Sequence, residues 1–281
     1  RLGFNSLWLD ESVSVAAAQS PIWQIVSSPR LDSQPPFYDV LLHFWLSVGG
    51  SEFILRFLSV FWGVLSVAIL YRFAKRLFGA SVALLSAFLL AIAPFHIWYS
   101  QEVRSYTLGA FFALTSLYFF HRVLSKGGKT YWLAYVLATV AGLYANYSMV
   151  ILVAVENVYF LVFAVRSKNV GLAQKWIIGQ AFIWIGFSPW LPYISDSLQF
   201  AAKDYSTLIT AQRIFEKLGL NLAGSELVAG MLALVLLVLS ITLTIRYDPR
   251  PRLRLLWASR LVPISLVLEV RPESATCRFA G

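Results

Sequence analysis

Long runs of apolar residues alternate with short polar segments along most of the chain. A helix that crosses about 30 Å of hydrocarbon needs roughly 20 residues that are mostly apolar. Runs that approach or reach this length lie at 54–71, 81–98, 105–121, 131–145, 147–165, 176–195 and 226–245. The pattern predicts an all-α, polytopic transmembrane protein with about seven visible spans.

The segment before these runs has a different pattern. Between residues 37 and 48, apolar side chains recur at spacings of three and four, which is the stripe of an amphipathic helix. Asp39 and His43 fall on the opposite face of that helix. It follows a pair of prolines, is too short to span, and is expected to lie in the membrane interface. Residues 12–27 predict a second, weaker interfacial helix.

Charge sets the orientation of the predicted spans. The 281 residues are 58% hydrophobic and 13% charged, with a formal net charge of +9, which excludes an ordinary soluble domain. Cations gather in alternate loops, at 72–76, 122–129, 166–175 and 246–260, while most acids lie in the other loops. The positive-inside rule places the cation-poor loops, including 1–52, in the periplasm or its equivalent. Topology therefore accounts for the basic excess, and no nucleic-acid partner is expected.

The topology divides the chain into three parts. Residues 1–52 form a first periplasmic loop with interfacial helices and an acidic pair, and residues 53–246 form the transmembrane domain. Residues 247–281 form a basic tail that we expect to be a truncated or aberrant end. The chain begins at Arg1 rather than Met, and we expect a truncation that removed a first transmembrane helix. A multi-pass protein of the plasma (inner) membrane is predicted.

The acidic pair Asp10–Glu11 stands out in so apolar a chain. One interpretation is a helix start, because acidic residues favour the positive end of the helix dipole. The other is a general base at the membrane surface, since a carboxylate can take the proton of an attacking hydroxyl. The sequence alone leaves both open.

A second cluster lies in the short outer loop "SQEVRSY", which holds Glu102 and Arg104. Arg104 either anchors a helix end at the interface or offers its planar fork to a phosphate. Arg56, near the outer end of the first visible span, either snorkels to the interface or faces a lipid phosphate. Asp32 lies just before the double proline.

Other polar residues raise weaker hypotheses. Glu156 lies in the middle of the fifth run, where a carboxyl is expensive and is either a functional group or a hydrogen-bonded packing residue. His43 and His96 lie on the outer side, but with Glu102 or Asp10 they match no known metal-ligand spacing. No cofactor follows from the sequence, and a divalent metal stays open.

Several motifs together resemble the membrane glycosyltransferases of the GT-C superfamily. In order they are the acidic pair, "PPFYDVLLHFW", "SEFILRFLS", "RLFG" and "PFHIWYSQEVRSYTL". The nearest branch is the protein O-mannosyltransferase and aminoarabinose-transferase type, including bacterial RgtA/B/C/D-like proteins. The resemblance covers residues 5–125, and the later spans match only in being hydrophobic.

The resemblance implies roles for individual residues. Asp10 matches the catalytic aspartate that activates the acceptor, and Glu11 matches the second acid that supports it. Arg104 matches the arginine that binds the donor phosphate; Tyr106 belongs to the same motif, and Glu102 lies beside it.

The implied reaction moves a sugar from a polyprenyl-phosphate donor to an acceptor hydroxyl on the periplasmic face, with inversion at the anomeric carbon. The acceptor is a glycan, a lipid or a protein, and membrane lipids surround the site. An alternative from another class is a transporter or flippase for a lipid-linked or small polar substrate, for which mid-membrane Glu156 is the fitting feature. A structural subunit without chemistry is a further rival.

Overall fold

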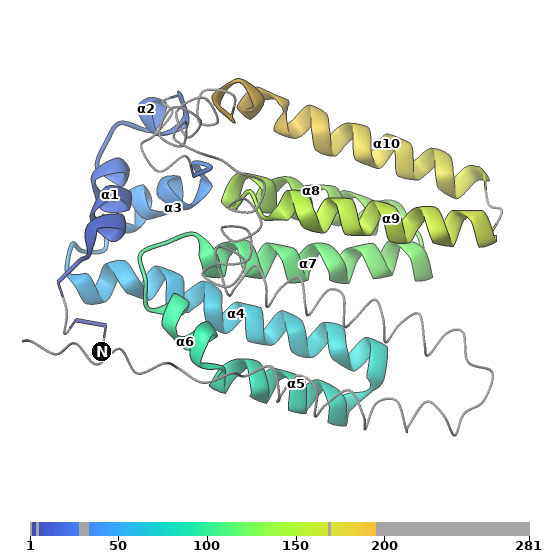
Figure 1. The fold of residues 1–281 in the computed structure, drawn as a ribbon, viewed down its shortest axis with the longest axis horizontal. Helices are drawn as coiled ribbons and strands as arrows, with labels where there is room; N and C mark the ends of the chain where they lie inside the picture. Colours follow the sequence, from blue (N-terminus) through green and yellow to red (C-terminus); the bar gives the residue numbers. More distant parts are fainter. Residues whose placement is uncertain (1, 4–5, 28–33, 168–169, 195–281) are drawn as a thin grey trace, which may run out of the picture. The chain divides into compact units, whose positions relative to one another are not determined.

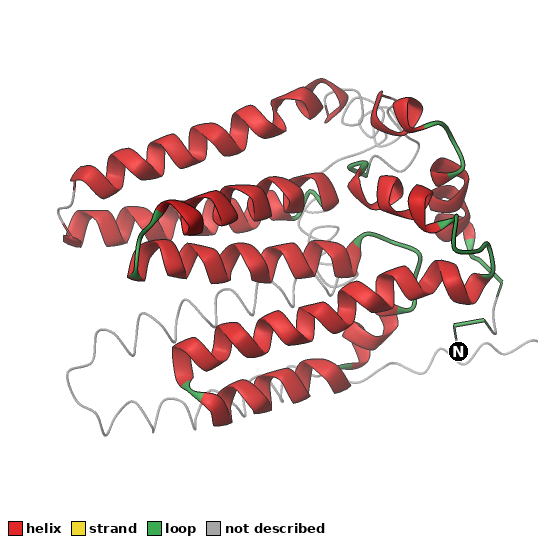
Figure 2. Ribbon diagram, turned by 180° about the vertical axis from the view of Figure 1, so that it is seen from behind, coloured by secondary structure: helices red, strands yellow, loops and turns green. Residues whose placement is uncertain are grey.

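The fold consists of long helices arranged side by side, with three short helices at one end of the bundle (Figure 1). This computed structural model describes residues 2–3, 6–27, 34–167 and 170–194. Within these ranges the chain forms helices and no strands (Figure 2). The prediction of an all-α protein is confirmed.

Within the described residues, the bundle contains six long or broken helical segments. They are α4 (Glu52–Phe78), α5 (Ala80–Ile92) with α6 (Pro94–Ser100), α7 (Tyr106–Ser125), α8 (Lys129–Ala145), α9 (Met149–Ser167) and α10 (Val170–Phe187), which continues into the 3-10 turn η1 (Ser188–Trp190). Helix α7 packs against both α4 and α8, and α10 packs against α8. These segments correspond to the first six predicted spans; the seventh, at 226–245, lies outside the described residues.

Three of these stretches are long and apolar enough to cross a membrane, considering only the residues described. They are Glu52–Phe78, Tyr106–Ser125 and Val170–Ile194. The pair α5–α6 makes a fourth if it is one bent span, and Met149–Ala164 is a shorter apolar helix. Helix α9 as a whole runs over 19 residues and covers most of the predicted run at 147–165.

The run at 81–98 forms two helices rather than one. Ala93 has an extended backbone (φ −63°, ψ 122°), Pro94 opens α6, and the two helices are bent by 58°. Proline disfavours the helical conformation of the residue before it and has no N–H to donate, so the break falls here. Helix α6 is fastened to α4, because His96 Nε2 lies 3.1 Å from the Gly63 carbonyl oxygen and a Cβ on Gly63 would collide with Ser100.

The short helices precede the bundle in sequence. They are α1 (Leu9–Ala18), α2 (Ile22–Ser27) and α3 (Phe37–Trp45), so the weaker helix predicted over 12–27 is two helices. In α3 the buried side chains are Tyr38, Asp39 and Leu42, while Phe44 is exposed. Of the predicted apolar stripe, Phe37, Leu41 and Trp45 are partly buried against the hydrophobic core, whereas Phe44 and Val48 are exposed. The stripe is thus divided between the protein and its surroundings.

A small hydrophobic core joins the short helices to the bundle. It contains residues from α1, α3, α4, α7, α8 and the loop after α6, namely Ala18, Tyr38, Leu42, Leu55, Leu58, Val103, Leu108 and Ala145. This core holds α1 against the N-terminal ends of α4 and α7. The acidic pair of α1 is thereby brought close to Arg56 and Arg104.

Candidate active site

Asp10 and Glu11 occupy the first turn of α1, where carboxylates favour the positive end of the helix dipole. The Trp8 N–H donates to Glu11 Oε2 at 3.3 Å, which helps to cap the helix. Consecutive residues of a helix point in different directions. The Glu11 side chain is 1% exposed, whereas that of Asp10 is 41% exposed.

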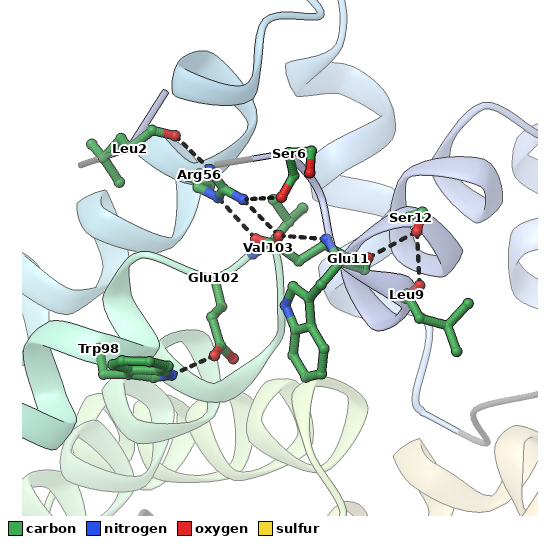
Figure 3. A network of polar contacts seen from close by, with 10 residues as sticks. Leu2, Ser6, Leu9, Glu11, Ser12, Arg56, Trp98, Glu102 and Val103 are labelled. Atoms are coloured by element: carbon green, nitrogen blue, oxygen red, sulfur yellow. Dashed lines mark hydrogen bonds and ion pairs between the residues drawn. The ribbon is translucent and has the colours of Figure 1, made fainter. Parts of the chain in front are cut away.

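Glu11 forms a buried ion pair with Arg56 of α4 (Figure 3). Arg56 Nε donates to Glu11 Oε1 at 3.0 Å and Nη2 donates to Oε2 at 2.7 Å, a bidentate geometry. The Val103 N–H also donates to Glu11 Oε1, at 3.0 Å. One carboxylate thus ties together α1, α4 and the loop that carries Arg104.

Arg56 also donates to backbone carbonyls of the N-terminal segment. Nη1 donates to the Leu2 carbonyl at 2.7 Å, and Nη2 donates to the Ser6 carbonyl at 3.3 Å. The Arg56 side chain is only 7% exposed. These contacts fasten the N-terminal segment and α1 to α4.

The hydrogen bonds of Glu11 stabilise its charged form. Burial raises the pKa of Glu11, but the Arg56 guanidinium and the N–H groups of Val103 and Trp8 outweigh burial, so the pKa lies below its ordinary value. Glu11 is therefore a fixed anion.

Arg104 faces the other acid of the pair. Its Nη2 lies 3.7 Å from Asp10 Oδ2, and its Nη1 donates to Ser14 Oγ at 3.3 Å. The Arg104 side chain is 9% exposed. The backbone is fastened as well, because Ser59 Oγ donates to the Arg104 carbonyl at 3.2 Å. A half-exposed carboxylate thus lies beside a rigidly held cation, at a separation longer than a hydrogen bond.

Glu102 lies close enough to this pair to feel its charges, and Tyr106 begins α7 two residues after Arg104. Trp98 Nε1 donates to Glu102 Oε1 at 2.7 Å. Burial raises the pKa of Glu102, the Trp98 hydrogen bond opposes this, and the carboxylates of Glu11 and Asp10 raise it further. Tyr106 packs edge to face on Tyr99, with ring centroids 4.7 Å apart.

A family model described as dolichyl-phosphate-mannose-protein mannosyltransferase matches residues 33–193, more than half of the 281 residues. The chain belongs to this family. Membership in this GT-C glycosyltransferase family confirms the resemblance drawn from the motifs, and the match extends beyond the 5–125 region on which that resemblance rested. It begins after Asp10 and Glu11, so their roles rest on the motif resemblance and on the geometry above.

Among solved structures, the crystal structure of ArnT from Cupriavidus metallidurans in the apo state is similar, with a TM-score of 0.54 and 17% identity. The similarity covers 70% of this chain and 39% of that chain. It shows that the chain has a multi-pass membrane fold, and that the chain spans well under two thirds of that protein's length. No curated protein matches the chain by sequence.

The structure also places the remaining candidates. His43 Nδ1 lies 2.7 Å from the Ala18 carbonyl oxygen, which joins α3 to α1 away from the Asp10–Arg104 pair. Asp32 lies outside the described residues. In the part of the chain that is described, no group of three or more His, Cys, Asp or Glu side chains could hold a metal ion.

Sequence reasoning missed three contributors to the site. They are Ser14, which contacts Arg104; Ser59, whose hydroxyl contacts the Arg104 carbonyl and the Tyr38 hydroxyl; and the Val103 N–H. Ser14 lies four residues after Asp10, so its place on the same helix face was available from spacing. The contacts of Ser59 and Val103 depend on tertiary packing and have no local signal.

The raised pKa of Glu102 predicts a pH dependence of stability. Between its ordinary value of 4.5 and the raised value, the folded state binds the proton more tightly than the unfolded state. Wild-type stability should therefore fall as pH rises through this window, and Glu102→Gln should remove that part of the dependence. Thermal unfolding of both proteins across the window measures the difference; parallel curves would contradict the prediction.

Proposed function

We propose that the protein transfers a sugar from a polyprenyl-phosphate donor to an acceptor hydroxyl at the periplasmic face of the plasma membrane, or the equivalent outer face. The observation that carries this proposal is the half-exposed Asp10 carboxylate beside the buried Arg104 guanidinium. Asp10 lies in the short helix α1 and Arg104 in the loop before α7, so neither lies inside a long helix of the bundle. Such a place suits a donor whose lipid tail stays in the membrane and whose sugar lies at its surface.

The proposed step is a single displacement. Asp10 takes the proton from the acceptor hydroxyl as its oxygen attacks the anomeric carbon. The bond between that carbon and the phosphate oxygen breaks, and polyprenyl phosphate leaves with the electron pair. The configuration at the anomeric carbon inverts, because attack and departure occur on opposite faces of the sugar.

Arg104 interacts both with the base, Asp10, and with the leaving phosphate. Before reaction its charge is compensated by Asp10. Once Asp10 is protonated, that compensation is lost while negative charge develops on the leaving phosphate. A positioned cation stabilises such charge most where water is scarce. Glu11 and Arg56 act as positioning residues, since their ion pair holds α1 and the Val103–Arg104 backbone in place.

Two substitutions of Arg104 should distinguish the contribution of its positive charge from that of its planar guanidinium group. Arg104→Gln should lower kcat/KM for the lipid-linked donor by about 10²–10³-fold, the usual cost of one transition-state donor. Arg104→Lys should lose less, because it keeps the charge without the planar fork. Arg76→Gln, at the far end of α4, is the matched control and should keep wild-type activity. Equal activity of all three variants would remove Arg104 from the reaction.

The bend between α5 and α6 favours the transporter alternative, since broken helices are common in transporters. The fate of the donor separates the two functions. Full-length protein in liposomes is given polyprenyl-phosphate sugars and membrane extract. A transferase separates the sugar from its carrier. A transporter moves the intact donor between leaflets and forms no product, which would overturn the proposal.

A further inference from the structure

A second buried carboxyl group lies among α7, α8, α9 and α10. Glu156 of α9 is 1% exposed. Its Oε1 lies 3.0 Å from Ser116 Oγ of α7, and its Oε2 lies 2.8 Å from the Tyr135 hydroxyl of α8. Within the described residues no ion pair reaches it. An ionised carboxylate without a compensating charge is costly at such a buried position. The directions of the neighbouring hydrogen bonds show whether Glu156 is ionised or neutral.

The hydrogen bonds on one side of Glu156 have a single possible direction. The indole N–H of Trp176 can only donate, so the atom 2.9 Å away is the Asn157 carbonyl oxygen. The Asn157 amide then donates to Gln180 Oε1 at 3.2 Å, and Gln180 Nε2 donates to the Tyr135 hydroxyl at 3.2 Å. Tyr135 therefore uses its own proton on Glu156 Oε2.

The hydrogen bonds on the other side of Glu156 also have only one possible direction. The Thr139 hydroxyl lies 2.8 Å from the Tyr135 carbonyl oxygen, which can only accept, so Thr139 donates there. The Ser116 and Thr139 hydroxyls are 2.9 Å apart, and the Ser116 proton must fill that contact. No hydroxyl proton is left for the contact between Ser116 Oγ and Glu156 Oε1.

An ionised Glu156 would leave one close pair of oxygens without a hydrogen between them. A protonated Glu156 satisfies every contact, because it accepts from Tyr135 and donates to Ser116. We propose that Glu156 is a bound-proton site, a neutral carboxylic acid that completes a one-way chain of hydrogen bonds from the Trp176 indole to the Tyr135 carbonyl, and that this proton clamps four helices together. Loss of the proton breaks the chain and loosens the bundle.

The groups around Glu156 predict that the stability of the bundle falls as pH rises. The groups that reach it are Ser116 from α7 and the titratable Tyr135 from α8, and the α10 side chain of Gln180 reaches Tyr135. Because the folded state holds the proton, its stabilising effect is complete at low pH and is lost as pH rises through the ionisation of Glu156.

Infrared difference spectroscopy on the full-length protein tests the protonation state directly. The spectrum of wild type minus that of Glu156→Gln should contain a carboxylic-acid carbonyl band at neutral pH that shifts in deuterated water. Carboxylate bands in its place would overturn the proposal.

Thermal unfolding of variants gives an independent test. Glutamine at this position donates through Nε2 and accepts through Oε1, so Glu156→Gln should unfold within about 2 °C of wild type, whereas Glu156→Ala and Ser116→Ala should each lower Tm by about 4 °C or more. As pH rises, wild type should lose stability relative to Glu156→Gln. A Glu156→Gln protein as unstable as Glu156→Ala, or a constant difference across pH, would contradict the neutral acid.

Discussion

Asp10→Asn should lower the rate of sugar transfer by about 10²–10⁴-fold, the usual contribution of a general base. The amide keeps the size of the carboxylate but cannot take the acceptor's proton at neutral pH. The fold should survive, because the Asp10 side chain is 41% exposed and its contact with Arg104 is 3.7 Å long. Partly exposed ion pairs contribute only about 0–1 kcal/mol to stability.

Donor binding and a control variant distinguish the loss of a base from a general loss of function. Donor binding by Asp10→Asn should stay close to that of wild type, so that the loss appears in kcat rather than in KM. Ser12→Ala, which alters an exposed side chain of the same helix, is the matched control and should be fully active. Wild-type turnover by Asp10→Asn would show that another group takes the proton.

Glu11→Ala should destabilise the protein by about 3–5 kcal/mol, the cost of breaking a buried ion pair by removing one partner. The Arg56 charge would remain buried, and the Val103 and Trp8 N–H groups would each lose an acceptor. Activity should fall as well, because the backbone before Arg104 loses its tie to α1. Glu52→Ala, in the first turn of α4, is the control and should cost no more than about 1 kcal/mol.

The direction in which stability changes with pH distinguishes an ion pair at Glu11 from a side chain that only packs. The lowered pKa means that its stabilisation is present above the ordinary value of 4.5 and is lost as pH falls toward the folded value. Wild type should therefore lose more stability in acid than Glu11→Gln does. Thermal unfolding at neutral and acidic pH measures this; identical acid sensitivity of the two proteins would contradict the assignment.

The helical spans were predictable because their signal is local. A run such as 54–71 carries enough apolar residues to be found without any tertiary information, and α4 covers it. The bend after Ala93 was less visible, since Pro94 can end a span or break one. The packing of α6 on Gly63, which depends on residues 33 apart, decided between these outcomes.

The sequence predicts which residues form the site, but it does not predict the separate role of each one. Asp10, Glu11, Arg56 and Arg104 all stand out as charged residues in a mostly apolar chain. Adjacent Asp10 and Glu11 look equivalent in the sequence, and only the packing of α1 shows that one is buried on Arg56 and the other faces Arg104. Likewise, Glu156 was visible as an expensive carboxyl, whereas its partners come from other helices.

The anomeric configuration of the product is the most direct test of the central claim that Asp10 acts as a base in a single displacement. Full-length protein in nanodiscs would be given a polyprenyl-phosphate sugar of known configuration, and the product would be analysed by NMR spectroscopy. The account predicts an inverted product, with one polyprenyl phosphate released for each sugar transferred. A product with retained configuration would contradict it, because a single displacement inverts the anomeric carbon whichever nucleophile attacks.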